Sequence, residues 1–176
     1  HYYYFSNSDL VWEDAKLISE DSFGHLVTIQ DADEDSFISN IVLNNLDQSI
    51  WQGRGVWAGA SDAQEEGDWQ WVTSEPFDYT NWRVSNGEPG GGTAENYLEK
   101  YPPYSHDGTW NDLFNDYSLH FILELETGCL DENACNYQSY AYSDDGSCEY
   151  AEENFDCAGN CLIDIDCFDV CGGSAV

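Results

Sequence analysis

Hydrophobic residues recur at helical spacing in two segments near the N-terminus of this chain. The first segment predicts a helix that has its N-cap at Ser8, continues to about Ser19 and is stopped at Gly24. The second predicts a helix capped by Asp31, with Glu34 at the spacing of a capping box. The expected apolar faces are formed by Leu10, Val11, Trp12, Ala15 and Ile18 in the first helix and by Phe37, Ile38, Ile41, Val42 and Leu46 in the second.

Short aromatic and aliphatic runs predict strands in the rest of the first 126 residues. These runs cover residues 2–5, 25–29, 56–58, 69–72, 97–99 and 118–123. Between Thr73 and Glu95 the sequence gives little regular signal, and a loop of that length in a compact domain is usually functional. The pattern therefore predicts a mixed α and β domain that carries a long functional loop.

The segment after Gly128 follows a different pattern, because it contains every cysteine of the chain. These are Cys129, Cys135, Cys148, Cys157, Cys161, Cys167 and Cys171. Such a density is typical of a disulfide-bonded segment in an oxidising, extracellular setting. Bridges between near neighbours, such as 129 with 135 or 157 with 161, are sterically possible, but the spacing does not choose among pairings. Seven is an odd number, so one thiol is free or pairs outside this chain.

We therefore predict two domains, a globular domain over residues 1–127 and a disulfide-stapled tail over residues 128–176. The tail contains a repeat with a period of ten residues, since Asp156-Cys157 and Cys161 are followed by Asp166-Cys167 and Cys171. The exposed tyrosines expected there are candidates for docking onto a second copy. We expect the tail to mediate self-association or spacing, as in a surface filament.

Charge narrows the possible partners. The 4 basic and 35 acidic residues give a formal net charge of -31. Such a chain cannot neutralise a phosphate backbone or an anionic membrane surface, so nucleic acid and anionic membranes are poor partners. No apolar run is long enough for membrane insertion. Divalent cations and neutral ligands remain, although solubility alone explains many carboxylates. Because the chain lacks methionine, we expect either that an upstream segment such as a signal peptide has been removed or that the chain is a fragment.

Four oxygen-bearing side chains near the long loop suggest a place for such a cation. Glu88 and Glu95 flank a glycine-rich stretch, and Asn111-Asp112 follow Trp110. We expect all four on loops, where a fold could bring them together. Ca²⁺ takes six to eight oxygen ligands at about 2.3–2.6 Å, so a folded loop that gathers these side chains would suit it.

Six motifs in order make residues 2–126 resemble a C-type lectin domain. They are Trp12-Glu13-Asp14-Ala15, Gly24-His25-Leu26-Val27-Thr28-Ile29, Trp57-Ala58-Gly59-Ala60-Ser61-Asp62, Gly67-Asp68-Trp69-Gln70-Trp71 with Tyr79-Thr80-Asn81-Trp82, Glu88-Pro89, and Trp110-Asn111-Asp112. The resemblance implies an α+β fold with two helices, short antiparallel sheets and a long calcium-binding loop. It also implies an extracellular, calcium-dependent module that binds glycans or glycoproteins, as an adhesion protein would.

The resemblance implies three calcium positions. The principal site would use Glu88, Glu95, Asn111 and Asp112, which in the family hold the ion and the sugar together, with the asparagine donating hydrogen bonds. A second site would use Asp62, Glu66 and Asn96. A third would use the Thr28 carbonyl, Glu34 and Glu124.

Several positions depart from the family pattern. Gly90 and Gly91 stand where the family has calcium-binding side chains. The two family disulfides map to Ser19 with Leu123 and to Tyr97 with Asn115, so we expect the domain to fold by packing alone.

Plainer explanations exist for some candidate ligands. Glu34 fits the capping box equally well, Asp62 and Glu66 could belong to a solvated acidic loop with Glu65 and Asp68, and Asn111-Asp112 could form only a turn.

Other functions compete with the lectin. The sequence does not favour an enzyme: the globular domain has no thiol, and His25 lies in an apolar strand. The serious alternative is a structural or assembly subunit of an extracellular fibre or stalk with a decayed sugar site, for which Gly90 is suggestive. An ice-binding role would need a regular surface array that the sequence does not contain.

Overall fold

A computed structural model describes residues 2–46, 53–165 and 170–173. The chain divides into two compact units, residues 1–125 and residues 126–176, which are described separately below.

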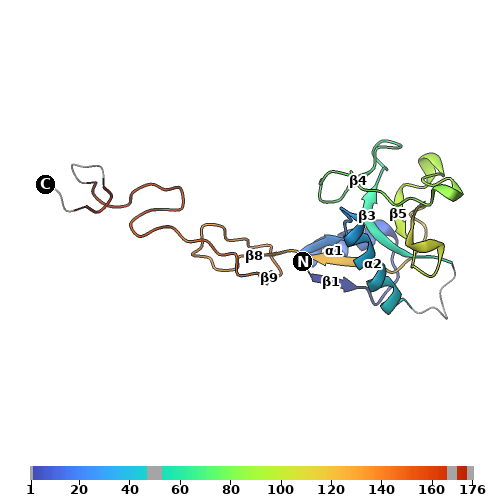
Figure 1. Ribbon diagram of the computed structural model, residues 1–176, viewed down its shortest axis with the longest axis horizontal. Coiled ribbons are helices and arrows are strands. Elements are labelled where there is room, and N and C mark those ends of the chain that lie inside the picture. The colour runs from blue at the N-terminus through green and yellow to red at the C-terminus, as the bar shows by residue number, and fades with distance from the viewer. Residues whose placement is uncertain (1, 47–52, 166–169, 174–176) are drawn as a thin grey trace. The chain divides into compact units, whose positions relative to one another are not determined.

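The first unit is built on small antiparallel sheets. One sheet has the order β1 (Tyr2–Phe5), β7 (Ile122–Leu125) and β2 (Gly24–Leu26). The other has the order β4 (Gln70–Trp71), β3 (Val56–Ser61), β5 (Tyr97–Lys100) and β6 (Trp110–Leu113). Short 3-10 turns lie at Val84–Asn86, Gly92–Ala94 and His106–Gly108. Figure 1 shows the second sheet beside the long segment that joins β4 to β5.

Helix α1 begins later than the sequence predicts. It spans Trp12–Asp21, its N-cap is Val11, and the Ser8 cap is wrong. The reason is Leu10, whose backbone exchanges hydrogen bonds of 3.0 and 2.9 Å with Leu119 and so stays extended. Ile18 was expected on the buried face, but it is 47% exposed, whereas Ser19 is fully buried.

The chain after α1 is also arranged differently from the prediction. The helix ends at Asp21, and Gly24 begins β2 rather than stopping the helix directly. A Cβ at Gly24 would lie 2.2 Å from the backbone oxygen of Glu124, so glycine is required for this close strand pairing. The strand ends at Leu26, and the backbone of the next residue, Val27, bonds to Ile122 on one side and to Gly59 on the other, so it links the two sheets.

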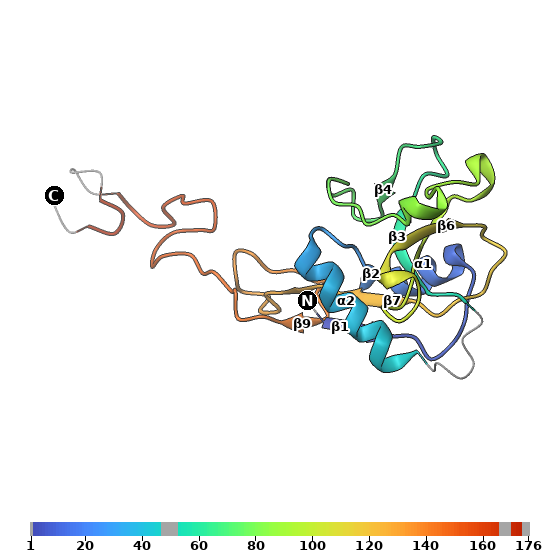
Figure 2. The ribbon, with the colours of Figure 1, turned by 45° about the vertical axis from the view of Figure 1, so that its right-hand side comes forward.

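Helix α2 spans Ala32–Asn45 and begins as predicted. The Asp31 carboxylate accepts hydrogen bonds of 2.9 Å from the N–H groups of Asp33 and Glu34. Glu34 instead accepts from the N–H of Gln30 at 2.7 Å, one residue before its expected capping-box partner. Ile38 and Val42 are fully buried, as predicted. Figure 2 shows the length of α2 on the outside of the unit.

The remaining strands agree with the sequence except at two places. The predicted strand over 118–123 is displaced, since β7 begins at Ile122 and Leu119 pairs with Leu10 instead. Asn111 and Asp112 do not lie on a loop or in a turn, because they belong to β6. Two α-helices and antiparallel sheets in the described part of this unit confirm the predicted α+β class.

A buried ion pair lies beneath the second sheet. Lys100 is fully buried, and its Nζ donates to Asp35 Oδ2 at 3.0 Å and to the Gly108 carbonyl. The other Asp35 oxygen accepts from the Trp110 indole at 2.7 Å. Burial lowers the pKa of Lys100, and the attraction of Asp35 opposes that shift. The network joins α2 to β5 and β6, next to Asn111.

Hydrogen bonds connect the positions where the family has a disulfide. Glu13 accepts from the Tyr97 hydroxyl at 3.2 Å and from the Asn115 amide at 2.9 Å, and its own N–H donates to Asn115 at 3.2 Å. The other pair of positions holds Ser19 and Leu123, both buried. The first unit is thus held by packing and hydrogen bonds.

The second unit is held by disulfides, in a pairing that skips near neighbours. The bonds are Cys129–Cys148, Cys135–Cys157 and Cys161–Cys171, and Cys167 lies outside the described residues. The strands β8 (Thr127–Gly128) and β9 (Ser143–Asp144) pair in parallel. The ten-residue repeat is visible in the backbone, because Phe155 pairs with Cys161 as Ile165 pairs with Cys171.

No helix among the residues described is long and apolar enough to cross a membrane.

Candidate calcium and ligand site

The pairing of β5 with β6 places the candidate residues at the end of the long loop. Leu98 lies opposite Asp112, and Glu99 lies opposite Asn111. Glu95 comes two residues before β5, so the loop that carries Glu88 and Glu95 ends beside the strand that carries Asn111 and Asp112.

Asp112 is tied to the glycine-rich part of this loop. It is 3% exposed, and its two carboxylate oxygens accept from the N–H of Gly90 at 3.0 and 2.8 Å. Burial, and then the hydrogen bond and charge of Glu88, raise the pKa of Asp112 to about 6. Glu88 itself follows a turn and accepts from the Asn86 amide at 2.6 Å, and its bond to Pro89 is cis. The negative charge of Glu88 therefore acts against ionisation of Asp112.

Glu95 adds a third negative charge to this region. Burial and the charge of Glu88 raise its pKa, while Arg54 acts in the opposite direction. The Glu95 side chain also explains Gly91, because a Cβ at that position would lie 2.0 Å from Glu95 Oε2. A residue with a side chain at position 91 would displace Glu95.

Asn111 is held by Glu99, a residue that was not among the sequence-predicted ligands. It is 7% exposed, and its amide nitrogen donates to Glu99 Oε2 at 3.1 Å and to the backbone oxygen of Asp112. Glu99 is fully buried, and burial raises its pKa while Gly55, Arg54 and Asn111 act against that rise. Both of these described hydrogen bonds use the amide nitrogen, so the carbonyl oxygen of Asn111 is the atom left for a cation.

The donor set suits a hard cation. Three carboxylates and one amide carbonyl are the oxygen ligands that Ca²⁺ prefers, and a cation would relieve the repulsion that Glu88 exerts on Glu95 and on Asp112. Within the part of the chain that the structure describes, however, no three His, Cys, Asp or Glu side chains lie close enough together to hold a metal ion. The carboxylates would have to converge further when an ion binds.

The second predicted set is only partly assembled. Asp62 is 4% exposed, and its Oδ2 accepts from the N–H of Gly67 at 2.9 Å. Its Oδ1 is buried without a hydrogen-bond partner, which is costly for a carboxylate unless a ligand satisfies it. The backbone N–H of Asp62 donates to the Asn96 carbonyl at 3.3 Å, so these two residues are neighbours, whereas Glu66 is exposed.

The third predicted set is brought together, but its carboxylates already accept hydrogen bonds from other groups of the protein. The Tyr3 hydroxyl donates to Glu34 Oε1 at 3.2 Å, and the N–H of Thr28 donates to Glu124 Oε2 at 3.2 Å. His25 Nδ1 lies 4.0 Å from the same Glu124 oxygen. Burial raises the pKa of Tyr3, and the charges of Glu124 and Glu34 add to that rise. These carboxylates have a structural role whether or not an ion joins them.

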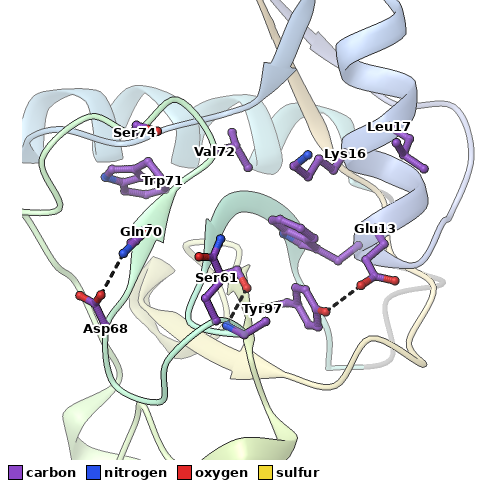
Figure 3. Close-up of a pocket in the computed structure, with 13 residues that line it drawn as sticks. Glu13, Lys16, Leu17, Ser61, Asp68, Gln70, Trp71, Val72, Ser74 and Tyr97 are labelled. Atoms are coloured by element: carbon purple, nitrogen blue, oxygen red, sulfur yellow. Dashed lines mark hydrogen bonds between the residues drawn. The ribbon is translucent and has the colours of Figure 1, made fainter.

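A cavity of about 530 Å³ lies between α1, the β3–β4 connection and β5. Figure 3 shows Glu13 turned toward Tyr97 and Asp68 turned toward Gln70. The polar side chains within each of these two pairs are bonded to each other along the wall, and the cavity is not lined by the candidate calcium ligands.

Sequence reasoning missed the charges that support the site, namely the buried Glu99, Lys100 and Asp35 and the partly buried Arg54. A signal was present, since Glu99 and Lys100 are adjacent charged residues in a strand with Tyr97 and Leu98. Buried charges are rare unless they are paired, so such a doublet in an apolar strand is informative.

Comparison with known proteins decides the family. The model of the lectin C-type domain matches residues 8–124. The chain belongs to the C-type lectin domain family. Domains of this family are binding modules, and this one is not an enzyme.

Individual C-type lectins resemble the chain at moderate identity. A perlucin-like protein of Mytilus galloprovincialis is 30% identical over 112 residues, which are 63% of this chain and 67% of that protein. The hepatic lectin of Gallus gallus is 29% identical over 124 residues, 69% of this chain and 53% of that protein. Human C-type lectin domain family 17, member A is 28% identical over 127 residues, 72% of this chain but 30% of that protein. The chain thus spans only part of the chicken and human relatives.

Solved structures give the same fold. The carbohydrate-recognition domain of mouse scavenger receptor C-type lectin has a TM-score of 0.56 at 32% identity, covering 68% of this chain and 84% of that one. A calcium-independent type II antifreeze protein has a TM-score of 0.57 at 24% identity, covering 68% and 82%, and at that identity the likeness concerns the fold alone.

Proposed function

We propose that the first unit is a calcium-dependent carbohydrate-binding module that holds a sugar at the end of the long loop. The observation that supports this most is the buried carboxylate of Asp112, which is held by the N–H of Gly90 beside Asn111, together with the charge of Glu88, which raises the pKa of both Asp112 and Glu95. The relatives include a hepatic lectin and a carbohydrate-recognition domain, which is consistent with a sugar as the ligand.

In this proposal Glu88, Glu95, Asp112 and the carbonyl of Asn111 would hold Ca²⁺. The ion would supply a centre at which two neighbouring sugar hydroxyls replace water. Carboxylate oxygens not used by the ion would accept hydrogen bonds from those hydroxyls. The N–H of Gly90 holds Asp112 in place from the loop side, and it does so where the family uses a side chain.

Calcium binding can be tested by thermal unfolding with calcium and with a chelator. Binding to the folded state alone should stabilise it by about 2.7 kcal/mol when calcium is at 100 times its dissociation constant. Asp112→Asn, which keeps the shape but removes a charge, should abolish most of this shift. Asp116→Asn removes a charge from a nearby exposed residue and should leave the shift intact. An unchanged melting temperature in the wild-type protein would rule out the site.

Sugar binding can be tested on a glycan array in the same two conditions. We expect binding that disappears with the chelator. Binding that persists would separate sugar recognition from the ion, and a calcium response without any glycan would favour a module that recognises protein.

We also propose an extracellular location and a role of the second unit in association or spacing. Disulfides within that unit fit an oxidising compartment. Tyr137, Tyr140, Tyr142 and Tyr150 are 40 to 59% exposed and offer an aromatic surface to a second copy. Sedimentation of the full chain against a chain that ends at residue 127 tests this role. A monomeric mass for the full chain would exclude self-association through the tail.

A further inference from the structure

Glu99 is the most deeply buried carboxylate next to the candidate site. It is fully buried, and its Oε1 accepts from the N–H of Gly55 at 2.6 Å. Its Oε2 accepts from Arg54 at 3.3 Å and from the Asn111 amide at 3.1 Å. These partners are all donors, which is the set that an ionised carboxylate requires.

We infer that Glu99 is a positioning residue that holds the Asn111 carboxamide with its NH₂ group inward and its carbonyl oxygen directed to the bound cation. The inference rests on the proposed calcium site, and it adds a residue that the resemblance does not assign. It also defines the role of Asn111. Because its amide nitrogen is bonded to Glu99, its carbonyl oxygen is the atom that can act as a ligand of the cation.

The reverse orientation of the amide is unfavourable for an electrostatic reason. Turning the carboxamide over would place its carbonyl oxygen against the Glu99 carboxylate, with two acceptors in contact and no proton between them. Glu99 cannot move aside to relieve this, because Gly55 and Arg54 fix its oxygens. Arg54 is fixed in turn, since its guanidinium lies 4.5 Å from the ring centre of Tyr117.

Arg54 also connects this support to the loop. It forms an ion pair with Glu99 at 3.3 Å, and its charge opposes the rise in pKa that burial and Glu88 cause at Glu95. One cation therefore balances the buried carboxylate without entering the ligand set. Supporting residues of this kind commonly change metal affinity by 10- to 100-fold when they are replaced.

The decisive substitution is Glu99→Gln. The N–H of Gly55 would keep the remaining amide oxygen at position 99, which leaves an NH₂ group facing Asn111. Two NH₂ groups cannot bond, so the Asn111 amide would turn over and present a donor to the ion. We expect calcium affinity, measured by isothermal titration on the full chain, to fall about 10- to 100-fold. Glu20→Gln, at an exposed residue of α1, should leave affinity unchanged.

A second substitution restores a hydrogen bond between positions 99 and 111, with the donor now at position 99 and the acceptor at position 111. Combining Glu99→Gln with Asn111→Asp gives a donor at position 99 and a carboxylate at position 111, one oxygen of which again faces the ion. We expect the double variant to recover at least about tenfold in affinity over Glu99→Gln. A merely structural role of Glu99 would not be rescued in this way. Asn111→Asp alone places two carboxylates in contact and should weaken binding even though it adds a charged ligand.

Three results separate the possibilities, with folding of each variant checked by near-ultraviolet circular dichroism in chelator. If the wild-type protein binds no calcium, the proposed function fails and this inference fails with it. If the wild type binds and a folded Glu99→Gln variant binds equally well, or the double variant is no better, only the role of Glu99 is overturned. If Glu99→Gln does not fold, tighter binding by Asn111→Asp alone overturns it.

Discussion

The two units of this chain are stabilised by different means. The first unit contains all seven tryptophans and all four lysines and arginines but no cysteine, and it has a core around Trp57 and Trp110. The second contains every cysteine, no tryptophan and no basic residue, and Leu162, Ile163 and Ile165 are 49 to 65% exposed there. One unit gains stability by burying apolar surface, and the other by restricting its unfolded chain.

The first unit lacks the two disulfides of the family pattern, and other contacts connect parts of it instead. Glu13 joins Tyr97 to Asn115 by hydrogen bonds where the family has a disulfide, and a buried ion pair joins α2 to the strand beside the site. Polar groups therefore connect one of the two expected disulfide positions, whereas at the other position Ser19 and Leu123 are only buried. The short second unit has no such core and keeps its bridges.

Reduction of the disulfides should show the largest difference in stability between the two units. Each bridge of the second unit closes a loop of 10 to 22 residues and contributes about 3 kcal/mol. We expect a mild reductant to make residues 126–173 sensitive to protease while the near-ultraviolet signal of the tryptophans stays unchanged. Loss of that signal would mean that the first unit depends on the second.

Breaking the buried ion pair should be the most damaging single change in the first unit. Lys100→Met leaves the Asp35 carboxylate buried without its cation and should cost about 3–5 kcal/mol in urea unfolding followed by tryptophan fluorescence. Lys16→Met removes a half-exposed cation that pairs with Glu20 and should cost less than about 1 kcal/mol. Similar losses in both variants would contradict the importance given to the buried pair.

Removing the Glu13 bridge should have a smaller effect. Glu13→Ala deletes hydrogen bonds to Tyr97 and Asn115 and should cost about 1–2 kcal/mol, since each such bond is worth about 0.5–1.5 kcal/mol. Glu20→Ala on the same helix should cost less than about 0.5 kcal/mol. Urea unfolding of the two variants side by side tests the comparison, and equal values would show that Glu13 does not replace a cross-link.

Much of the fold could be predicted from local sequence. Asp31 caps α2 through contacts within three residues, and that prediction is confirmed. The start of α1 was wrong because the extended backbone of Leu10 is imposed by Leu119, more than a hundred residues away. The burial of Ser19 was missed for a different reason: its hydroxyl bonds to the Ala15 carbonyl within the helix, so this polar residue can occupy a core position.

The candidate ligands of the site could be predicted from the sequence, but the residues that hold those ligands in place could not. Motif order placed Glu88, Glu95, Asn111 and Asp112, whose convergence on an ion stays a prediction. The role of Glu99 depends on the register that sets it opposite Asn111, which a single sequence does not reveal. The same holds for Gly91, whose lack of a side chain was interpreted as a lost ligand but also makes room for Glu95.

The ten-residue repeat of the second unit has a consequence for how such a protein could evolve. Phe155 with Cys161 and Ile165 with Cys171 form the same local pairing in successive repeats, and Cys161 is bonded to Cys171 in the next repeat. Contacts between neighbouring repeats are enough to define such a unit, as in other repeat proteins. Duplication or deletion of one repeat would therefore change its reach in steps of fixed length, and selection could adjust that reach independently of what the lectin domain recognises.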